Sequence, residues 1–132
     1  MTLPAVGARA RLSRTFSDGD IETFVRLSGD DSPIHVDEEY AARSRFGRRI
    51  VHGLLAVSQL SAVLGTLLPG PGTIYLSQSF QFKAPVFIGD TITSEVIVEE
   101  VRADKPIVTL RTILTNQDGK IVIEGQAVVL AP

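Results

Sequence analysis

The apolar positions near the start of the chain predict one strand followed by one amphipathic helix. Residues 8–15 form a strand candidate, and Ser17 behind them is a good helix N-cap. Apolar side chains then recur at helical spacing over residues 18–28, with acidic residues in the first turn, where they favour a helix start. Gly29 is suited to end this helix because glycine adopts the left-handed backbone of many helix C-caps.

The next stretch interrupts that pattern. Pro33 fixes its own φ and disfavours helical backbone at the residue before it, so we expect residues 30–36 to form an ordered loop without regular structure. Asp37 can then cap a short helical piece over residues 38–43.

A long uncharged segment occupies the middle of the chain. Residues 51–68 contain no Asp, Glu, Lys or Arg, and "PGPG" at residues 69–72 ends the segment. The length would suit a membrane span, but the glycines and several polar side chains do not. A helix that is apolar nearly all round is also expected at the centre of a globular fold. We therefore predict a long buried helix and no membrane association.

The period changes to two after this helix. Apolar and polar residues alternate over 74–83, and further strand patterns cover 91–101, 107–115 and 120–130. The connections "IGD", "ADKP" and "NQDG" are short, and short connections imply antiparallel neighbours. The sequence thus predicts an α+β fold with a mostly antiparallel sheet.

Composition narrows the class of protein. The 132 residues are 44% hydrophobic and fit a single domain spanning 1–132 with a substantial core. A net charge of -2 argues against a nucleic-acid partner, which would require a basic face. The chain has no cysteine, so it has neither disulfides nor thiolate metal ligands. Residues 1–14 lack a signal-peptide pattern, so we expect a cytoplasmic location.

One motif carries specific chemistry. The run "FVRLSGDDSPIHVDEEYA", residues 24–41, resembles the signature of the MaoC-like dehydratases, the (R)-specific enoyl-CoA hydratase (hydratase 2) family. The family pattern places "SGD" on residues 28–30 and an aliphatic residue followed by histidine on Ile34 and His35. Ser32 stands where the family usually has Asn, and we expect its shorter hydroxyl still to cap and orient the loop.

The resemblance continues through residues 50–90, which look like the family's central helix, the strand after it and a "PV-x-x-GD" turn. The family's fold is the hot-dog fold, an antiparallel β-sheet wrapped around a long central α-helix. The resemblance also implies a homodimer and no metal or redox cofactor, with the acyl-CoA thioester as substrate. The strongest similarity is to the single-domain type linked to polyhydroxyalkanoate monomer supply.

Hydration of a 2-enoyl thioester needs an activated water, a proton for C2 and a donor for the thioester oxygen. Asp30 and His35 lie five residues apart on the proline-stiffened loop, and the resemblance implies that they hold one water between them. A partly buried site would raise the carboxylate pKa toward neutrality. Gly53, at the helix start, is the expected backbone donor to the carbonyl. The resemblance further implies that Ser61 orients the catalytic loop.

Other chemistry-bearing residues have simpler interpretations. His52, the second histidine, fits a structural residue at a helix start better than a second base. The acidic residues beside His35 fit a solvated helix start better than a metal site, because no ligand spacing recurs. A basic cluster lies next to the proposed site, and two of its members, Arg48 and Arg49, could contact the phosphates of CoA or of a phosphopantetheine carrier.

The leading hypothesis is a lyase that reversibly hydrates trans-2-enoyl-CoA to (R)-3-hydroxyacyl-CoA by syn addition. A 3-hydroxyacyl-ACP dehydratase is a close variant. A hot-dog acyl thioesterase is a second class, although such enzymes typically carry a carboxylate on the central helix and this helix has none. A non-catalytic acyl-binding subunit is a third class, and the presence of both Asp30 and His35 argues against it.

Overall fold

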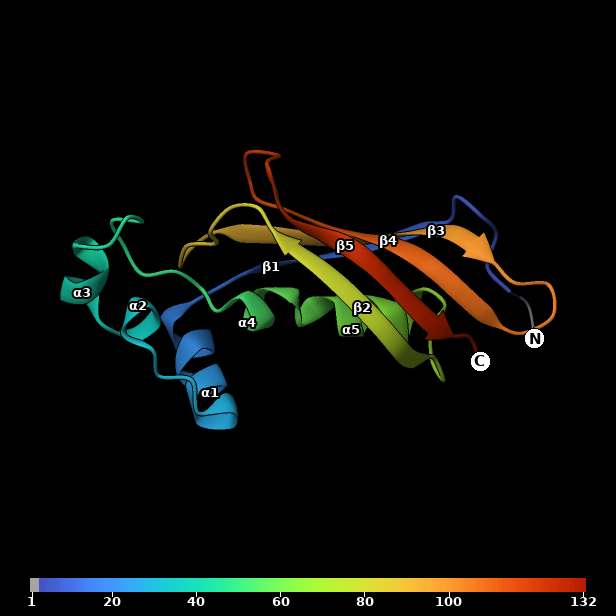
Figure 1. Cartoon of the computed structure of the whole chain (residues 1–132), viewed down its shortest axis with the longest axis horizontal. Helices are drawn as coiled ribbons and strands as arrows, with labels where there is room; N and C mark the ends of the chain where they lie inside the picture. Colours follow the sequence, from blue (N-terminus) through green and yellow to red (C-terminus); the bar gives the residue numbers. More distant parts are fainter. Residues whose placement is uncertain (1–2) are drawn as a thin grey trace.

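The computed structural model describes residues 3–132, which form a five-stranded antiparallel sheet with helices along one face and at one end (Figure 1). The sheet has the order β1-β3-β4-β5-β2. Its strands are β1 (Arg9–Thr15), β2 (Ile74–Phe82), β3 (Thr91–Val101), β4 (Ile107–Thr115) and β5 (Ile121–Leu130). The predicted α+β class is confirmed.

The strand order departs from the sequence prediction at β2. We expected β2 and β3 to pair as antiparallel neighbours, which is wrong: β2 lies at the sheet edge against β5, whereas β3 lies between β1 and β4. The connection between them makes other contacts. The Val51 N–H donates to the Val86 carbonyl at 2.7 Å, and Ile50 bridges to Phe87. This segment is therefore held against the chain leading into the central helix and forms no hairpin.

The first helix, α1 (Asp18–Ser28), begins and ends as predicted. The Ser17 side chain accepts from the Asp20 N–H, and the Asp20 carboxylate accepts from the Ser17 N–H, which makes a capping box. At the other end Gly29 adopts a left-handed backbone with φ of 79°. This reversal directs the chain into the loop that carries Asp30.

The predicted loop contains a helical turn. Residues 30–36 were expected to be irregular, but α2 (Pro33–Val36) closes one turn there and α3 (Glu38–Ala42) follows. Pro33 is the first residue of α2, where its fixed φ suits a helix and its missing N–H costs nothing. The same proline that disfavours helix before it thus starts the turn that carries His35.

The central helix is shorter and less regular than predicted. It begins at Gly53 and divides into α4 (Gly53–Val57), α5 (Gln59–Ala62) and a π-turn, η1 (Val63–Leu67). At the first break the Ser58 hydroxyl and N–H both donate to the Leu55 carbonyl, at 2.7 and 3.1 Å. This side-chain bond competes with the regular helical pattern and tightens the turn.

Only one face of this segment is buried. In Figure 1 the segment runs along one face of the sheet, and the two contribute to one apolar core whose helical members include Ala56, Leu60, Val63 and Leu64. On the opposite face Leu54 is 64% exposed and Leu67 is 48% exposed. The prediction of a helix buried all round is therefore wrong for a single chain.

The edge strand β2 has a similar uncovered surface. Its apolar side chains Ile74, Leu76 and Phe82 are exposed, and its outer edge has no neighbouring strand among residues 3–132.

No helix within residues 3–132 combines the length and apolar character needed to cross a membrane.

Candidate active site

The loop after α1 is folded by the carboxylate of Asp30. Its Oδ1 accepts from the Ser32 N–H at 3.1 Å, and the Asp30 N–H donates to the Ser28 hydroxyl at 3.1 Å. The expectation that the Ser32 hydroxyl caps the loop is wrong, because this side chain makes no capping hydrogen bond. The aspartate caps the serine backbone instead, so the Ser hydroxyl is not needed for the local fold.

His35 is buried, with 9% of its surface exposed. The hydrogen-bond partner of its ring determines which ring nitrogen carries the proton. Its Nδ1 lies 2.8 Å from the carbonyl oxygen of Ile50. A carbonyl only accepts, so Nδ1 carries the proton and Nε2 of the neutral ring keeps its lone pair. The His35 ring is thus fixed as a base at Nε2.

The segment before the central helix holds His35 from a second side. The Arg49 Nε donates to the main-chain carbonyl of His35 at 2.8 Å. The Arg49 guanidinium also pairs with Asp18 and, at 3.2 Å, with Glu38, and only 11% of its side chain is exposed. Arg49 therefore ties α1, α2 and α3 together. Of the two arginines suggested for phosphate contacts, the exposed one is Arg48, whose guanidinium lies 3.9 Å from the centre of the Phe87 ring.

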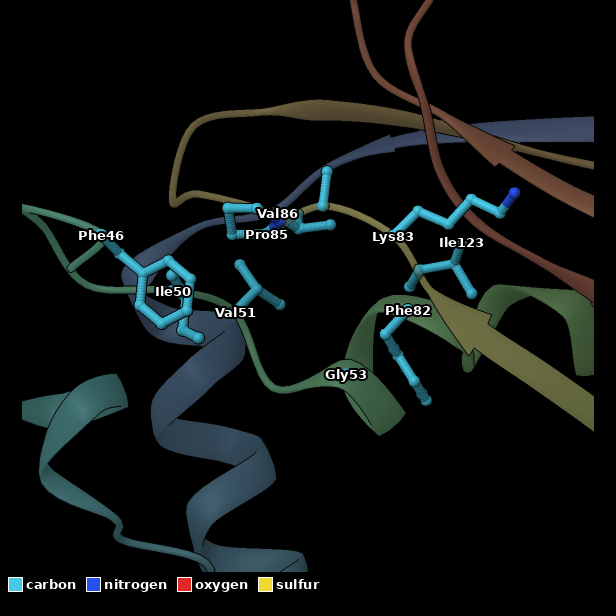
Figure 2. Close-up of a pocket in the computed structure, with 10 residues that line it drawn as sticks. Phe46, Ile50, Val51, Gly53, Phe82, Lys83, Pro85, Val86 and Ile123 are labelled. Carbon is cyan, nitrogen blue, oxygen red and sulfur yellow. The ribbon is translucent and has the colours of Figure 1, made fainter.

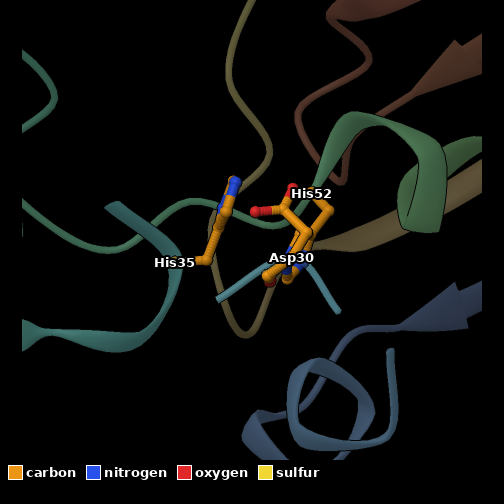
Figure 3. Close-up of side chains that lie close together, drawn as sticks. All are labelled: Asp30, His35 and His52. Atoms are coloured by element: carbon orange, nitrogen blue, oxygen red, sulfur yellow. The ribbon is translucent and has the colours of Figure 1, made fainter. Parts of the chain in front are cut away.

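The structure brings Asp30 and His35 to one place, together with a third group. One carboxylate oxygen of Asp30 and one ring nitrogen each of His35 and His52 all lie within 4.8 Å of one another. Figure 3 shows the Asp30 carboxylate turned toward the His35 ring. The carboxylate was expected to be partly buried, but Asp30 is exposed in the single chain because the loop lies at the surface.

The pKa of His35 is lowered from its ordinary value of 6.5. Burial is the largest cause, since it disfavours the charged ring, and the neighbouring His52 acts in the same direction. The Ile50 carbonyl and the Asp30 carboxylate oppose the shift. The net result favours a neutral imidazole, which is the form that can accept a proton near neutrality.

His52 was interpreted from sequence as a structural residue, and its closeness to the pair was missed. Its ring stacks on His35 with centroids 3.8 Å apart and an interplanar angle of 23°. Its Nε2 lies 2.9 Å from the main-chain carbonyl of Asp30. The only signal in the sequence was its position directly before Gly53, the expected carbonyl-binding residue.

The same three side chains are poorly arranged for a metal ion. Lone pairs of imidazole nitrogens lie in the ring plane, so two nearly parallel stacked rings present them side by side and not toward a common point. His35 also uses Nδ1 for the Ile50 carbonyl. The cluster fits proton transfer better than metal coordination.

Gly53 begins α4 and lies on the wall of an apolar cavity of about 280 Å³ (Figure 2). A Cβ at this position would stand 2.6 Å from Cε1 of Phe82, closer than real contacts allow. A methyl group here would therefore displace the Phe82 ring of β2. The cavity is lined by Phe46, Ile50, Val51, Gly53, Phe82, Lys83, Ala84, Pro85, Val86 and Ile123.

Ser61 lies elsewhere in the single chain. It faces a groove of about 440 Å³ between the central helix and β2, together with Ser58, Tyr75 and Gln78. None of the side-chain hydrogen bonds found among residues 3–132 joins Ser61 to the Asp30 loop. Its loop-orienting role stays a prediction.

Comparisons with known proteins agree with this geometry. The family model "MaoC like domain" matches residues 3–118. An (R)-specific enoyl-CoA hydratase of Aeromonas caviae is 49% identical over 96% of this chain and 95% of its own length. A protein of the same name from Rhodospirillum rubrum is 52% identical over 96% of this chain and 87% of its own.

A solved structure of an (R)-hydratase from A. caviae involved in PHA biosynthesis superimposes with a TM-score of 0.95 at 48% identity, covering 98% of both chains. This chain belongs to the MaoC-like family and has the hot-dog fold. The fold and family expected from the motif at residues 24–41 are confirmed.

Proposed function

We propose that this chain is an (R)-specific enoyl-CoA hydratase, a hydro-lyase that adds water to trans-2-enoyl-CoA to give (R)-3-hydroxyacyl-CoA. The observation that carries the proposal is the meeting of the Asp30 carboxylate with the His35 ring, whose Nε2 is fixed as an acceptor. The names of the A. caviae and R. rubrum relatives support the same reaction.

We propose the following roles for the two side chains. A water held between Asp30 and His35 gives a proton to Nε2 of His35 while its oxygen bonds to C3 of the enoyl group. The resulting imidazolium is stabilised by the Asp30 carboxylate, and its Nε2 proton then passes to C2. The hydroxyl and the hydrogen thus come from one water on one face, which is syn addition, and no metal or redox cofactor takes part.

Gly53 is the proposed donor to the thioester oxygen. Charge develops on that oxygen as C3 is attacked, and a backbone N–H at the first residue of a helix has no partner within the helix. The absent side chain lets the Phe82 ring pack directly against the start of the helix, next to this N–H. Ser61, on the same helical segment, is retained as a loop-orienting residue.

We propose that CoA carries the acyl group of the substrate. Arg48 is exposed, lies over the Phe87 ring and makes no ion pair among residues 3–132, so its charge can meet a CoA phosphate, whereas Arg49 is paired with two carboxylates. An acyl-carrier-protein thioester offers a phosphopantetheine phosphate to the same arginine, so a dehydratase acting on a carrier protein is the second candidate.

A homodimer is proposed from the uncovered apolar surface. Leu54 and Leu67 on the central helix and Ile74, Leu76 and Phe82 on β2 are exposed in the single chain. The outer edge of β2 also has no partner strand within residues 3–132, and pairing with another copy would cover both features. Light scattering after gel filtration should give twice the chain mass, and Leu76→Glu should lower it.

The activity is tested with crotonyl-CoA. Hydration removes the absorbance of the conjugated thioester without releasing free thiol, and the product is (R)-3-hydroxybutyryl-CoA. Thiol release would indicate a thioesterase, which is disfavoured because α4, α5 and η1 contain no carboxylate. No reaction at all would indicate a non-catalytic subunit. A higher rate with crotonyl-ACP would select the carrier-protein dehydratase.

We further propose a cytoplasmic role that connects enoyl-CoA from fatty acid breakdown to polyhydroxyalkanoate synthesis. The (R) configuration of the product supports this, as does the PHA role stated for the similar A. caviae hydratase. The test is polymer accumulation in cells that express this chain together with a polymer synthase.

A further inference from the structure

We propose that His52 is a positioning residue that fixes the Asp30 backbone against the His35 ring, and that the two stacked imidazoles have opposite tautomers. This inference rests on the proposed function, since it takes Asp30 and His35 as the reacting pair. It assigns to His52 a role beyond that of a residue filling space at a helix start.

His52 is hydrogen-bonded to the loop that carries Asp30. The Nε2 of His52 lies 2.9 Å from the Asp30 carbonyl oxygen. The carbonyl can only accept, so His52 must carry its proton on Nε2. The bond joins the residue before Gly53 to the backbone of the aspartate itself, across a separation of 22 positions in the chain.

The His52 ring also stacks on the ring of the proposed base. His52 is 2% exposed and lies between Phe24, at a centroid distance of 4.7 Å, and His35, at 3.8 Å. His35 is itself fixed at Nδ1 by the Ile50 carbonyl. One ring thus bonds the backbone that carries the carboxylate and supports the face of the base. A shift of His52 would change the distance between the two reacting groups.

The other ring nitrogen of His52 has an unfavourable environment. The Nδ1 of His52 is fully buried and has no hydrogen-bond partner among residues 3–132. With the proton on Nε2, this nitrogen is a bare acceptor, so the unsatisfied group costs stability. A residue chosen for packing alone would be served better by an apolar ring. The buried nitrogen therefore argues that the Nε2–H bond to Asp30 is the reason for a histidine at this position.

The tautomers can be measured directly, because the chain contains only two histidines and both lie in this site. Nitrogen-15 NMR of the imidazoles in the full chain should show His35 protonated at Nδ1 and His52 protonated at Nε2. A resting protein in which His52 carries its proton on Nδ1 would overturn the proposal, whatever the activity.

Substitutions test the positioning role. His52→Phe keeps a flat ring between Phe24 and His35 but has no donor, so kcat for crotonyl-CoA hydration should fall about 10- to 100-fold with KM nearly unchanged. His52→Gln places an amide N–H where Nε2 lies, and it should recover much of that loss. Phe24→Leu is the packing control: it loosens the stack but leaves the donor, and its effect on kcat should be smaller than that of His52→Phe.

The outcomes separate this inference from the proposed function. Wild-type kcat in folded His52→Phe, or a kcat no better in His52→Gln than in His52→Phe, would overturn the positioning role. If His52→Phe does not fold, the glutamine variant and the NMR spectrum of the wild-type chain still decide. If the wild-type chain shows the two tautomers but does not hydrate crotonyl-CoA, the proposed function fails while the geometry stands.

Discussion

The Arg49 Nε donates to the main-chain carbonyl of His35 at 2.8 Å. The contact joins a side chain with 11% exposure to the backbone of the proposed base. Because Ile50, the next residue, accepts from the ring of the same histidine, residues 49 and 50 hold both the backbone and the ring of His35. The orientation of the base therefore depends on a segment that does not belong to the signature motif.

Replacing Arg49 by lysine should lower both stability and turnover. Lysine keeps the charge but lacks the planar fork that serves the His35 carbonyl and two carboxylates together. We expect the free energy of unfolding to fall by about 1–2 kcal/mol and kcat to fall about tenfold. Urea denaturation and crotonyl-CoA kinetics measure the two effects. Unchanged kcat would show that the base is oriented without Arg49.

Arg48 provides the contrasting case. Arg48→Gln should raise KM for crotonyl-CoA and leave kcat nearly unchanged, because the proposed phosphate contact serves binding alone. Loss of the exposed contact with the Phe87 ring should lower the free energy of unfolding by no more than about 1 kcal/mol. Crotonyl-pantetheine, which has no phosphate, is the matched control and should react equally well with both proteins. An equal rise in KM for both substrates would contradict the phosphate contact.

Gly53→Ala should remove activity more than stability. Its backbone does not require glycine, but the added Cβ would collide with the Phe82 ring at 2.6 Å. The ring can turn aside, so we expect the free energy of unfolding to change by less than about 1 kcal/mol. The added methyl group lies beside the proposed donor N–H and hinders the approach of the thioester oxygen, so kcat/KM should fall at least about tenfold.

The double variant Gly53→Ala with Phe82→Leu separates the two effects of that methyl group. It relieves the collision and should recover any lost stability, measured by denaturation, without recovering kcat/KM. Alanine keeps the backbone N–H, so wild-type kcat/KM in the single variant would contradict the need for an open approach at residue 53.

The lowered pKa of His35 has consequences for pH dependence. The base must be neutral in the free enzyme, so kcat/KM should stay constant as the pH falls through 6.5 and decline only below it. The unfolded chain regains the ordinary pKa and binds a proton first as the pH falls. The stability contributed by neutral His35 is thus fully present above pH 6.5 and is lost as the pH falls through the folded pKa.

Kinetic profiles and urea denaturation between pH 5 and 8, a window chosen around the histidine range, measure these two trends. His35→Ala should remove the part of the stability change that comes from this residue. An acid limb of kcat/KM centred above 6.5 would contradict the buried, neutral base.

Local signals predicted the elements that depend on local chemistry. The Ser17 capping box, the left-handed Gly29 and the turn at residues 116–119 follow from side chains acting on their own backbone. The position of β2 did not follow, because it depends on the contact of residues 50 and 51 with residues 86 and 87, far apart in the sequence.

The candidate site was predictable to a similar extent. The motif predicted the pair Asp30 and His35, because two side chains five positions apart on one stiff loop lie close together in space. His52 and Arg49 could not be recognised, because their partners at Asp30 and His35 are main-chain carbonyls, which leave no trace in residue identity. The exposed face of the central helix was not predicted, because an uncharged sequence fits a buried core helix as well as a helix face that packs against another subunit.

The proposed hydration requires the Asp30 carboxylate and the His35 imidazole to act on one water. The rate of crotonyl-CoA hydration in Asp30→Asn and His35→Ala tests this requirement, with Asp31→Asn as the neighbouring exposed carboxylate control. We predict a fall in kcat of about a hundredfold or more for the first two and nearly unchanged kcat for the control. Wild-type turnover in folded Asp30→Asn or His35→Ala, or an equal loss in Asp31→Asn, would contradict it.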